Sequence, residues 1–153
     1  MSDDSAYLAG LKLLARRDLS ESQVRQRLSQ RGYPSDAVGE AIDRLREERA
    51  IDDDRVAATI ARKQTVVRRR GALRVRREIE QAGISSSVAR RVVDETFQAV
   101  DSAALLEQTL TRRLRGRERI ADQKELQRLH RYLIAQGFEP DAVMKALKAR
   151  RAP

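Results

Sequence analysis

Three glycines at nearly even spacing constrain the fold of this chain more than any other feature of its 153 residues. Gly32, Gly83 and Gly137 lie 51 and 54 residues apart. Each follows a stretch with the apolar spacing of a helix, and so fits the left-handed position that ends many helices. Apolar residues recur at fixed distances from all three glycines, which is the sequence signature of a repeat protein.

These recurring apolar residues stand eight and four residues before each glycine, and one, five, nine and ten residues after it. In that order they are Val24, Val75 and Leu129; Leu28, Ile79 and Leu133; Tyr33, Ile84 and Phe138; Ala37, Val88 and Ala142; Ala41, Val92 and Ala146; and Ile42, Val93 and Leu147. Apolar residues three or four apart share one face of a helix, so we expect these positions to face a partner helix.

A further helical stretch precedes each glycine-centred pair of helices, over about residues 5–17, 53–68 and 102–115. Strand-type alternation of useful length is absent. The sequence therefore predicts an all-α fold of about nine helices, arranged as three tandem three-helix repeats. Because neighbouring repeats bury apolar surface against one another, we expect an elongated, curved string of modules. The predicted repeat boundaries are 1–51, 52–100 and 101–153.

Apolar stripes and capping residues predict the buried faces and the starts of the helices. The stripes of the first and fourth helices are Leu8, Leu11, Leu14 and Ala15, and Val56, Ile60 and Val67. Ser20 precedes an apolar-periodic stretch and suits an N-cap. Acids at residues 36, 52–54 and 141 mark further helix starts, where they oppose the positive end of the helix dipole.

Composition excludes several classes of site. The chain has no cysteine and a single histidine, His130, which rules out a disulfide scaffold, a thiolate zinc site and a multi-histidine metal site. Asp52, Asp53 and Asp54 are expected to cap a helix rather than bind Mg²⁺, because adjacent helical side chains point about 100° apart. Since no nucleophile and base are identifiable, we expect no enzymatic activity, no cofactor and no small-molecule substrate.

Targeting signals are not apparent in the sequence. No apolar run approaches the ~20 residues of a membrane span. Residues 1–5 are acidic and polar, unlike the start of a secretory signal. We therefore expect a cytoplasmic protein without a membrane partner.

The charge of the chain points to a polyanionic partner. Lysine and arginine number 32 and aspartate and glutamate 23, which gives a net charge of +9, and such a balance is typical of proteins that bind nucleic acid or an acidic surface. Residues 40–54 hold seven acids, whereas residues 62–77 hold eight basic residues and no acid. The eight are Arg62, Lys63, Arg68, Arg69, Arg70, Arg74, Arg76 and Arg77.

Gly71 marks a break between two helices inside this basic segment. Arginines at the start of the following helix are unfavourable to its dipole, which is easier to explain if anions or acidic side chains bind there. A second basic cluster, interrupted by Glu118, lies at the end of a later helix: Arg112, Arg113, Arg115, Arg117 and Arg119. Solvated helix faces are the alternative interpretation of both clusters.

A stand-alone basic DNA-binding module is one function that these features allow. The helix pairs around the three glycines allow a helix-turn-helix arrangement, but the basic residues gather in the second repeat instead of recurring on one helix. Stacking on single strands needs exposed aromatic residues. Only 3% of the chain is aromatic, and Tyr33 and Phe138 are expected in the repeat core.

Four segments resemble the RecX family of recombinase regulators. Residues 50–57 resemble the family's LDDxRFA pattern, and residues 71–84 resemble its GPxRIRxEL…KGI pattern. Residues 13–33 resemble its first repeat, and residues 131–138 its RFL…GF pattern. The resemblance extends from about residue 8 to residue 148 and so covers nearly the whole chain.

Two positions depart from the family's patterns. Val56 stands where the family has phenylalanine, and Ala72 where it has proline. Both replacements are apolar, so we expect the fold to persist, with an effect on the packing of the second repeat.

The resemblance implies a cytoplasmic, non-enzymatic modulator of RecA made of three three-helix repeats. It implies binding in the helical groove of the RecA–DNA filament, weaker direct binding to single- or double-stranded DNA, and suppression of RecA ATPase, strand-exchange and coprotease activities. Asp52 and Asp53 are interpreted as structural, and Arg55 lies on the helix before the basic segment. The positions carried over as filament- or DNA-facing are Arg62, Arg68, Arg69, Arg70, Arg74, Arg76 and Arg77.

Overall fold

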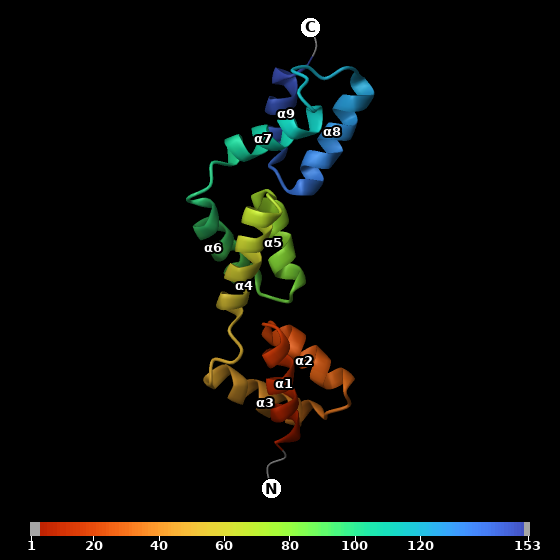
Figure 1. Cartoon of the computed structure of the whole chain (residues 1–153). Helices are drawn as coiled ribbons and strands as arrows, with labels where there is room; N and C mark the ends of the chain where they lie inside the picture. Colours follow the sequence, from red (N-terminus) through yellow and green to blue (C-terminus); the bar gives the residue numbers. More distant parts are fainter. Residues whose placement is uncertain (1–3, 152–153) are drawn as a thin grey trace. The chain divides into compact units, whose positions relative to one another are not determined.

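The structure is a computed structural model that describes residues 4–151. Over this range the chain is helical, which confirms the predicted all-α class (Figure 1). The helices are α1 Ser5–Arg16, α2 Glu21–Gln30, α3 Ser35–Glu47, α4 Asp53–Arg62, the π-helical turn η1 Lys63–Val67, α5 Ala72–Gln81, α6 Ser86–Phe97, α7 Ser102–Leu114, α8 Gln123–Gln136 and α9 Pro140–Ala149. Among the described residues there is no strand, and a single β-bridge joins Ile120 and Arg151.

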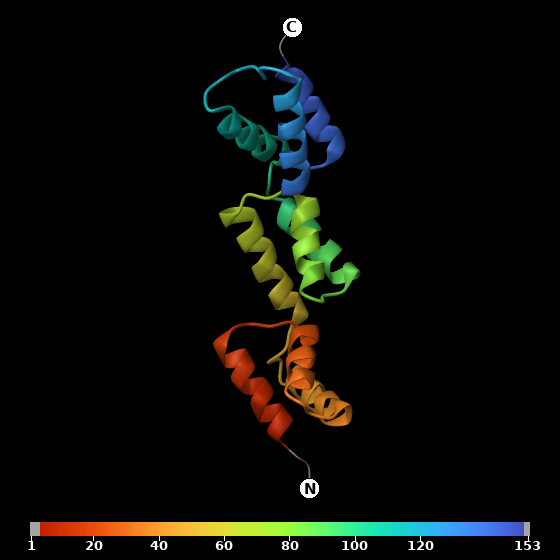
Figure 2. The ribbon, with the colours of Figure 1, turned by 90° about the vertical axis from the view of Figure 1, so that its right-hand side faces the viewer.

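The chain divides into two compact units. The first comprises the described residues up to Ile60 together with Ile79–Val92, and the second comprises Ala61–Glu78 together with the described residues from Val93 on. Helices α1 to α3 lie in the first unit and α7 to α9 in the second (Figure 2), while α4, α5 and α6 contribute to both. The repeat boundaries at residues 51 and 100 stay a prediction.

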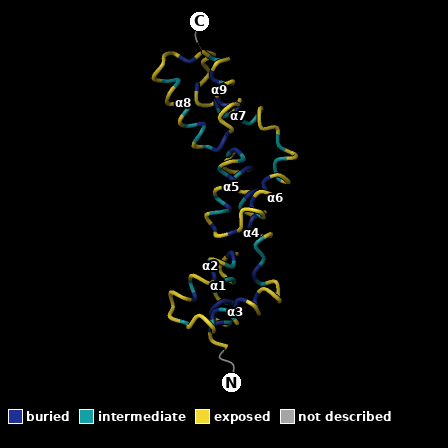
Figure 3. Tube along the Cα trace, turned by 180° about the vertical axis from the view of Figure 1, so that it is seen from behind, coloured by how far each residue is buried: buried dark blue, intermediate teal, exposed yellow. Residues whose placement is uncertain are grey.

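Each unit is built on a leucine- and valine-rich core. Along every helix, buried positions alternate with exposed ones at helical spacing, so that one side of the helix faces the core (Figure 3). The positions four residues before the repeat glycines, Leu28, Ile79 and Leu133, are all fully buried. Ala142 is an exception among the predicted core positions, because it is exposed in the first turn of α9.

The predicted face of α1 is only partly right: Leu11 and Leu14 pack against the core, but Leu8 and Ala15 are exposed. Leu8 is 53% exposed, and the buried residues of α1 are Ala6, Ala9, Gly10 and Leu13. The cause is close packing against α3: a Cβ on Gly10 would overlap the Leu45 side chain. Small residues allow this approach, so α1 turns its alanines inward and leaves Leu8 outside.

The predicted stripe of the fourth helix also fails at its end. Val67 is 70% exposed and its neighbour Val66 is 68% exposed, whereas Thr65 is buried. The reason is the π-helical turn, in which the Arg68 N–H donates to the Lys63 carbonyl 3.1 Å away. A π turn holds one more residue than an α turn, so the apolar spacing loses its register there.

The predicted glycine conformations are confirmed. Gly32, Gly83 and Gly137 have φ of 92°, 83° and 98°, which is the left-handed region. Ser20 is the N-cap of α2 and forms a capping box with Gln23: its side chain accepts from the Gln23 N–H, and its own N–H donates to the Gln23 side chain.

In the first unit, the start of α2 is joined to the end of α5. The Ser20 hydroxyl donates to the Ala82 carbonyl, just after the last residue of α5. Beside it, the Glu21 N–H donates to the Asp53 carboxylate at 2.9 Å. Asp52 caps α4 by accepting from the Arg55 N–H at 3.1 Å. Asp52 therefore caps the helix start that the sequence predicted, whereas Asp53 holds the start of α2 instead.

In the second unit, the start of α5 is joined to the end of α8, here through backbone N–H groups (Figure 1). The Gly71 N–H donates to the Gln136 carbonyl at 2.9 Å, and the Leu73 N–H donates to the Gly137 carbonyl at 3.1 Å. A Cβ on Gly71 would collide with the Gly137 carbonyl, and a Cβ on Gly137 would collide with Arg74. The joint therefore requires glycine on both sides.

We predict that Gly137→Ala destabilises the chain more than Gly116→Ala does. Both glycines have positive φ, 98° and 86°, so both substitutions carry the cost of a left-handed alanine, about 1–2 kcal/mol. Of the two, only Gly137 has atoms within reach of an added Cβ. Gly137→Ala should therefore lower the free energy of unfolding by about 2 kcal/mol more than Gly116→Ala does. Urea unfolding followed by circular dichroism measures both losses, and equal values would contradict the close approach.

Candidate functional site

The structure brings part of each predicted basic cluster together in the second unit. Arg68 and Arg69 follow η1, and Arg112 and Arg113 lie in the last turn of α7. All four are exposed, and they line one small hollow of about 60 Å³ with Gln108, Thr109, Tyr132 and Gln136. Sequence separation concealed this proximity, because more than forty residues lie between the two pairs.

Tyr132 on α8 organises this hollow. Its ring packs against the core of the second unit, and the guanidinium carbon of Arg113 lies 3.8 Å from the ring centroid. A cation over an aromatic face is attracted to the ring, so Arg113 is held in place without losing its charge. No ion pair involves Arg68, Arg69, Arg112 or Arg113 within the described range.

The positive surface continues along α7 and α8. An open groove of about 680 Å³ is lined by Arg112, Arg113, Arg115, Arg117, Glu125, Arg128, Leu129 and Tyr132. We call the arginines of this groove, together with Arg68 and Arg69, the basic face. Its local charge is strongly positive, because Glu125 is the one acid among these lining residues.

Glu125 is held by the segment that precedes α8. Its carboxylate accepts from both terminal nitrogens of Arg117, at 2.9 and 2.7 Å, and from the Ala121 N–H at 3.1 Å. Hydrogen bonding to Arg117, followed by that to Ala121, lowers the pKa of Glu125 below its ordinary value. The same pairing raises the pKa of Arg117. One arginine is thus neutralised, and the others remain available to a partner.

Arg70 and Arg74 have internal partners. Arg74 donates to the Glu78 carboxylate at 2.8 Å and to the Ala135 carbonyl at 3.0 Å, and Arg70 lies 3.5 Å from Glu78. The Arg70 and Arg74 side chains are only 17% and 26% exposed. The two N–H groups at the start of α5 are also occupied, by the end of α8. The partner that the arginine-rich helix start seemed to require is therefore, in part, another helix of the same chain.

The other predicted positions differ in exposure. Arg62 and Arg77 are exposed, whereas Arg76 is half-buried and has an interaction within the chain. Arg55 pairs with Asp18 at 3.0 and 3.1 Å in the first unit. The predicted set is therefore not one continuous surface, and its role in binding stays a prediction.

Two exposed valines adjoin the arginines and were not predicted. Val66 and Val67 lie immediately before Arg68 and Arg69 in the chain, and more than two thirds of the surface of each is accessible. Their exposure follows from the π turn, for which the sequence carries no signal. An apolar pair beside a cationic pair offers two kinds of contact to one partner.

The described residues show no arrangement suited to metal binding. Within residues 4–151, no group of three or more histidine, cysteine, aspartate or glutamate side chains is placed to hold a metal ion. His130 is half-buried on α8 and has no carboxylate among the residues that share its pocket. Over the same range, no helix combines the length and hydropathy of a membrane span.

Comparison with known proteins gives one consistent result. Residues 6–45 match the family model described as RecX, first three-helix domain. The chain is 31% identical over 137 residues to the regulatory protein RecX of Chromohalobacter salexigens, covering 90% of this chain and 87% of that one. It is 32% identical over 141 residues to the regulatory protein RecX of Halorhodospira halophila, covering 92% and 85%.

Solved structures share the fold. The crystal structure of RecX from Lactobacillus salivarius matches with a TM-score of 0.77 at 17% identity, covering 95% of this chain and 94% of that one. A second crystal structure, of regulatory protein RecX, matches with a TM-score of 0.73 at 24% identity, covering 94% and 70%. At these identities the likeness establishes the fold, and it confirms the predicted three-helix organisation.

We predict that Arg117→Gln raises the pKa of Glu125 towards the ordinary value of about 4.3. Because the folded-state pKa is lowered, the carboxylate contributes stability that is present above the unfolded pKa and lost as pH falls through the folded one. Wild type should therefore have the larger free energy of unfolding at pH 7, and the difference from the variant should vanish in acid.

Carbon-13 NMR titration of Glu125 and urea unfolding at several pH values measure these effects. Arg115→Gln is the matched control, because Arg115 lies in the same segment and forms no ion pair within the described chain. An unchanged pKa of Glu125 in Arg117→Gln would show that the hydrogen bonds to Arg117 do not set it.

Proposed function

Because the chain belongs to the RecX family of regulatory proteins, we propose that it regulates RecA by binding the RecA–DNA filament. In this proposal the protein inhibits RecA ATPase, strand exchange and coprotease activity. It acts by occupying the filament, without a catalytic step and without a cofactor. The premise rests on two relatives that are more than 30% identical over most of both chains, each a regulatory protein RecX.

One observation supports a nucleoprotein partner in particular: the basic face lies next to exposed apolar residues. The unpaired arginines Arg68, Arg69, Arg112 and Arg113 suit phosphate, which dominates affinity for nucleic acids. Phosphate offers nothing to Val66 and Val67, whose burial would contribute roughly 25 cal/mol per Å². A filament of protein wound on DNA presents both kinds of surface.

The seven arginines carried over from the family resemblance have different roles in this proposal. Arg62, Arg68, Arg69 and Arg77 are exposed and contact the filament. Arg70 and Arg74 support that surface from within, through Glu78 and the end of α8. Arg76 belongs with the second group, because it is half-buried and engaged within the chain.

A stand-alone DNA-binding module remains the second candidate. The four unpaired arginines around Tyr132 favour it, since bare DNA alone could engage them. That function leaves the exposed valines unexplained, which is why filament binding is our first choice.

The test is single-stranded-DNA-dependent ATP hydrolysis by RecA from the same organism, with this protein titrated in. We predict suppression by wild type. The double variant Arg68→Ala with Arg69→Ala should need roughly tenfold more protein for half suppression, a change of about 1.4 kcal/mol in binding.

Arg16→Ala with Arg17→Ala is the matched control. It removes two adjacent exposed arginines that belong to the first unit, whereas the basic face belongs to the second, and it should behave like wild type. No suppression by wild type, on filament shown to be assembled, would refute the proposed function. Equal suppression by both double variants would refute the role of Arg68 and Arg69 alone.

A further inference from the structure

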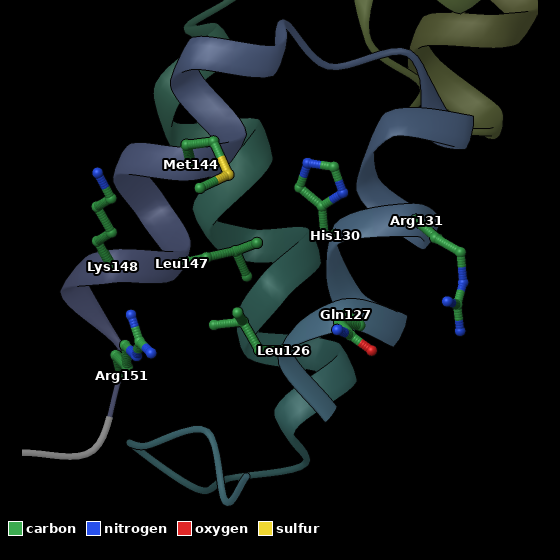
Figure 4. Close-up of a pocket in the computed structure, with 8 residues that line it drawn as sticks. All are labelled: Leu126, Gln127, His130, Arg131, Met144, Leu147, Lys148 and Arg151. Carbon is green, nitrogen blue, oxygen red and sulfur yellow. The ribbon is translucent and has the colours of Figure 1, made fainter. Parts of the chain in front are cut away.

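A second surface of the second unit is apolar in its floor and cationic at its edges. Helices α8 and α9 enclose a groove of about 340 Å³. Leu126 of α8 and Leu147 of α9 face each other across it, with Met144 beside them (Figure 4). Met144 is 41% exposed although it is a large apolar residue. The groove is thus an incompletely covered part of the hydrophobic interior.

Cationic side chains surround this floor. Arg131, Lys148 and Arg151 line the groove with Gln127 and His130, and no acid is among the lining residues. Within residues 4–151, none of the three cations forms an ion pair. Arg150 provides a contrast, because it pairs with Glu107 and bonds to Thr111 at 3.0 Å.

The groove is separate from the basic face. None of its lining residues is an arginine of that face. On α8 the groove uses Leu126, Gln127, His130 and Arg131, and the arginine and tyrosine of the basic face, Arg128 and Tyr132, lie two residues after Leu126 and His130. Residues two apart on a helix point about 200° apart, so the two surfaces occupy different sides of α8.

We propose that this groove binds an acidic amphipathic segment of a partner protein. An apolar side chain of that segment rests on Leu126, Met144 and Leu147, and carboxylates on either side of it meet Lys148, Arg131 and Arg151. A helix that lays its apolar side into a groove is a common form of peptide recognition.

Three properties of the groove favour this occupant over others. Its volume lies at the lower end of the roughly 300–1,000 Å³ range of ligand sites, which suits a side-chain anchor. Methionine adapts to different apolar shapes, as a peptide groove requires. Cations without internal partners attract carboxylates, while an apolar floor gives no advantage to phosphate. The proposal does not depend on the proposed function, because it concerns different residues.

The chain offers a direct reporter for the experiment. Met144 is the one methionine among residues 4–151, so its methyl signal in methyl-labelled protein reports on the groove. The probe is a blocked, synthetic amphipathic helix with leucines on one side and glutamates flanking them. We expect a saturable shift of the Met144 methyl signal with this peptide.

Two control peptides separate the parts of the proposal. Replacing the glutamates by lysines tests the charge, and replacing the leucines by glutamines tests the anchor; neither peptide should shift Met144. Lys148→Glu should weaken binding of the acidic peptide about tenfold. Lys145→Glu is the matched variant, because it makes the same charge change on α9 outside the groove, and it should leave binding within about twofold of wild type.

Several outcomes would overturn the proposal. They are an unmoved Met144 signal at millimolar acidic peptide, equal binding of the lysine peptide, and equal effects of Lys148→Glu and Lys145→Glu. A shift produced by a single-stranded oligonucleotide in place of the peptide would assign the groove to nucleic acid. A shift that follows protein concentration without peptide would assign it to a second copy of the chain. RecA ATPase suppression is measured separately, so failure of either proposal leaves the other standing.

Discussion

Helix ends that meet other helix ends hold this protein together. The first N–H groups and last carbonyls of a helix have no partner within it, and an unpaired buried group costs roughly 1–3 kcal/mol. Here the start of α5 receives the carbonyls of Gln136 and Gly137, and the start of α2 receives the Ala82 carbonyl. In each joint the negative end of one helix dipole meets the positive end of another, which is electrostatically favourable.

The joint between α5 and α8 also positions the candidate site. Gly71 is fixed to Gln136, and Tyr132 lies one turn earlier on α8. This contact also holds Arg68 and Arg69, which come shortly before Gly71 in the chain. They line the same hollow as Tyr132 and Gln136. The basic face thus depends on a backbone contact that only glycine permits, and on a left-handed Arg69 with φ of 54°.

Arginine serves two purposes in this chain, and pairing distinguishes them. Arg55, Arg70, Arg74 and Arg117 are bound to carboxylates of the same chain. The pairs of Arg55 and Arg117 are exposed and orient segments more than they stabilise them, whereas Arg70 and Arg74 are largely covered where they meet Glu78. The unpaired arginines keep their full charge for a partner. Net charge alone does not distinguish the two groups, which is why a basic segment in the sequence was only a partial guide to the site.

The sequence was sufficient for the repeat, the helix class and the left-handed glycines, because each of these follows from local periodicity and backbone conformation. It was also sufficient for the family, through motifs near residues 50–57 and 71–84. It failed for Leu8 of α1, where close packing against Leu45 places Ala6, Ala9 and Gly10 in the core and leaves Leu8 exposed. It failed again at Val67, where a π turn changed the register. The packing of α1 against Leu45 and the meeting of Arg68 with Arg112 are tertiary effects, which local periodicity does not describe.

The central claim is that the partner is a protein–DNA filament rather than DNA alone. Its most direct test compares the affinity of the protein for assembled RecA filament with its affinity for bare single-stranded DNA, both at about 0.15 M salt. The account predicts filament binding at least about tenfold tighter, a difference of ~1.4 kcal/mol. Replacing Val66 and Val67 by serine should reduce only filament binding, and Leu8→Ser, at an exposed leucine of the first unit, should change neither. Bare DNA bound as tightly as filament, with a steep salt dependence and no effect of the valine substitutions, would contradict the claim and identify a DNA-binding module.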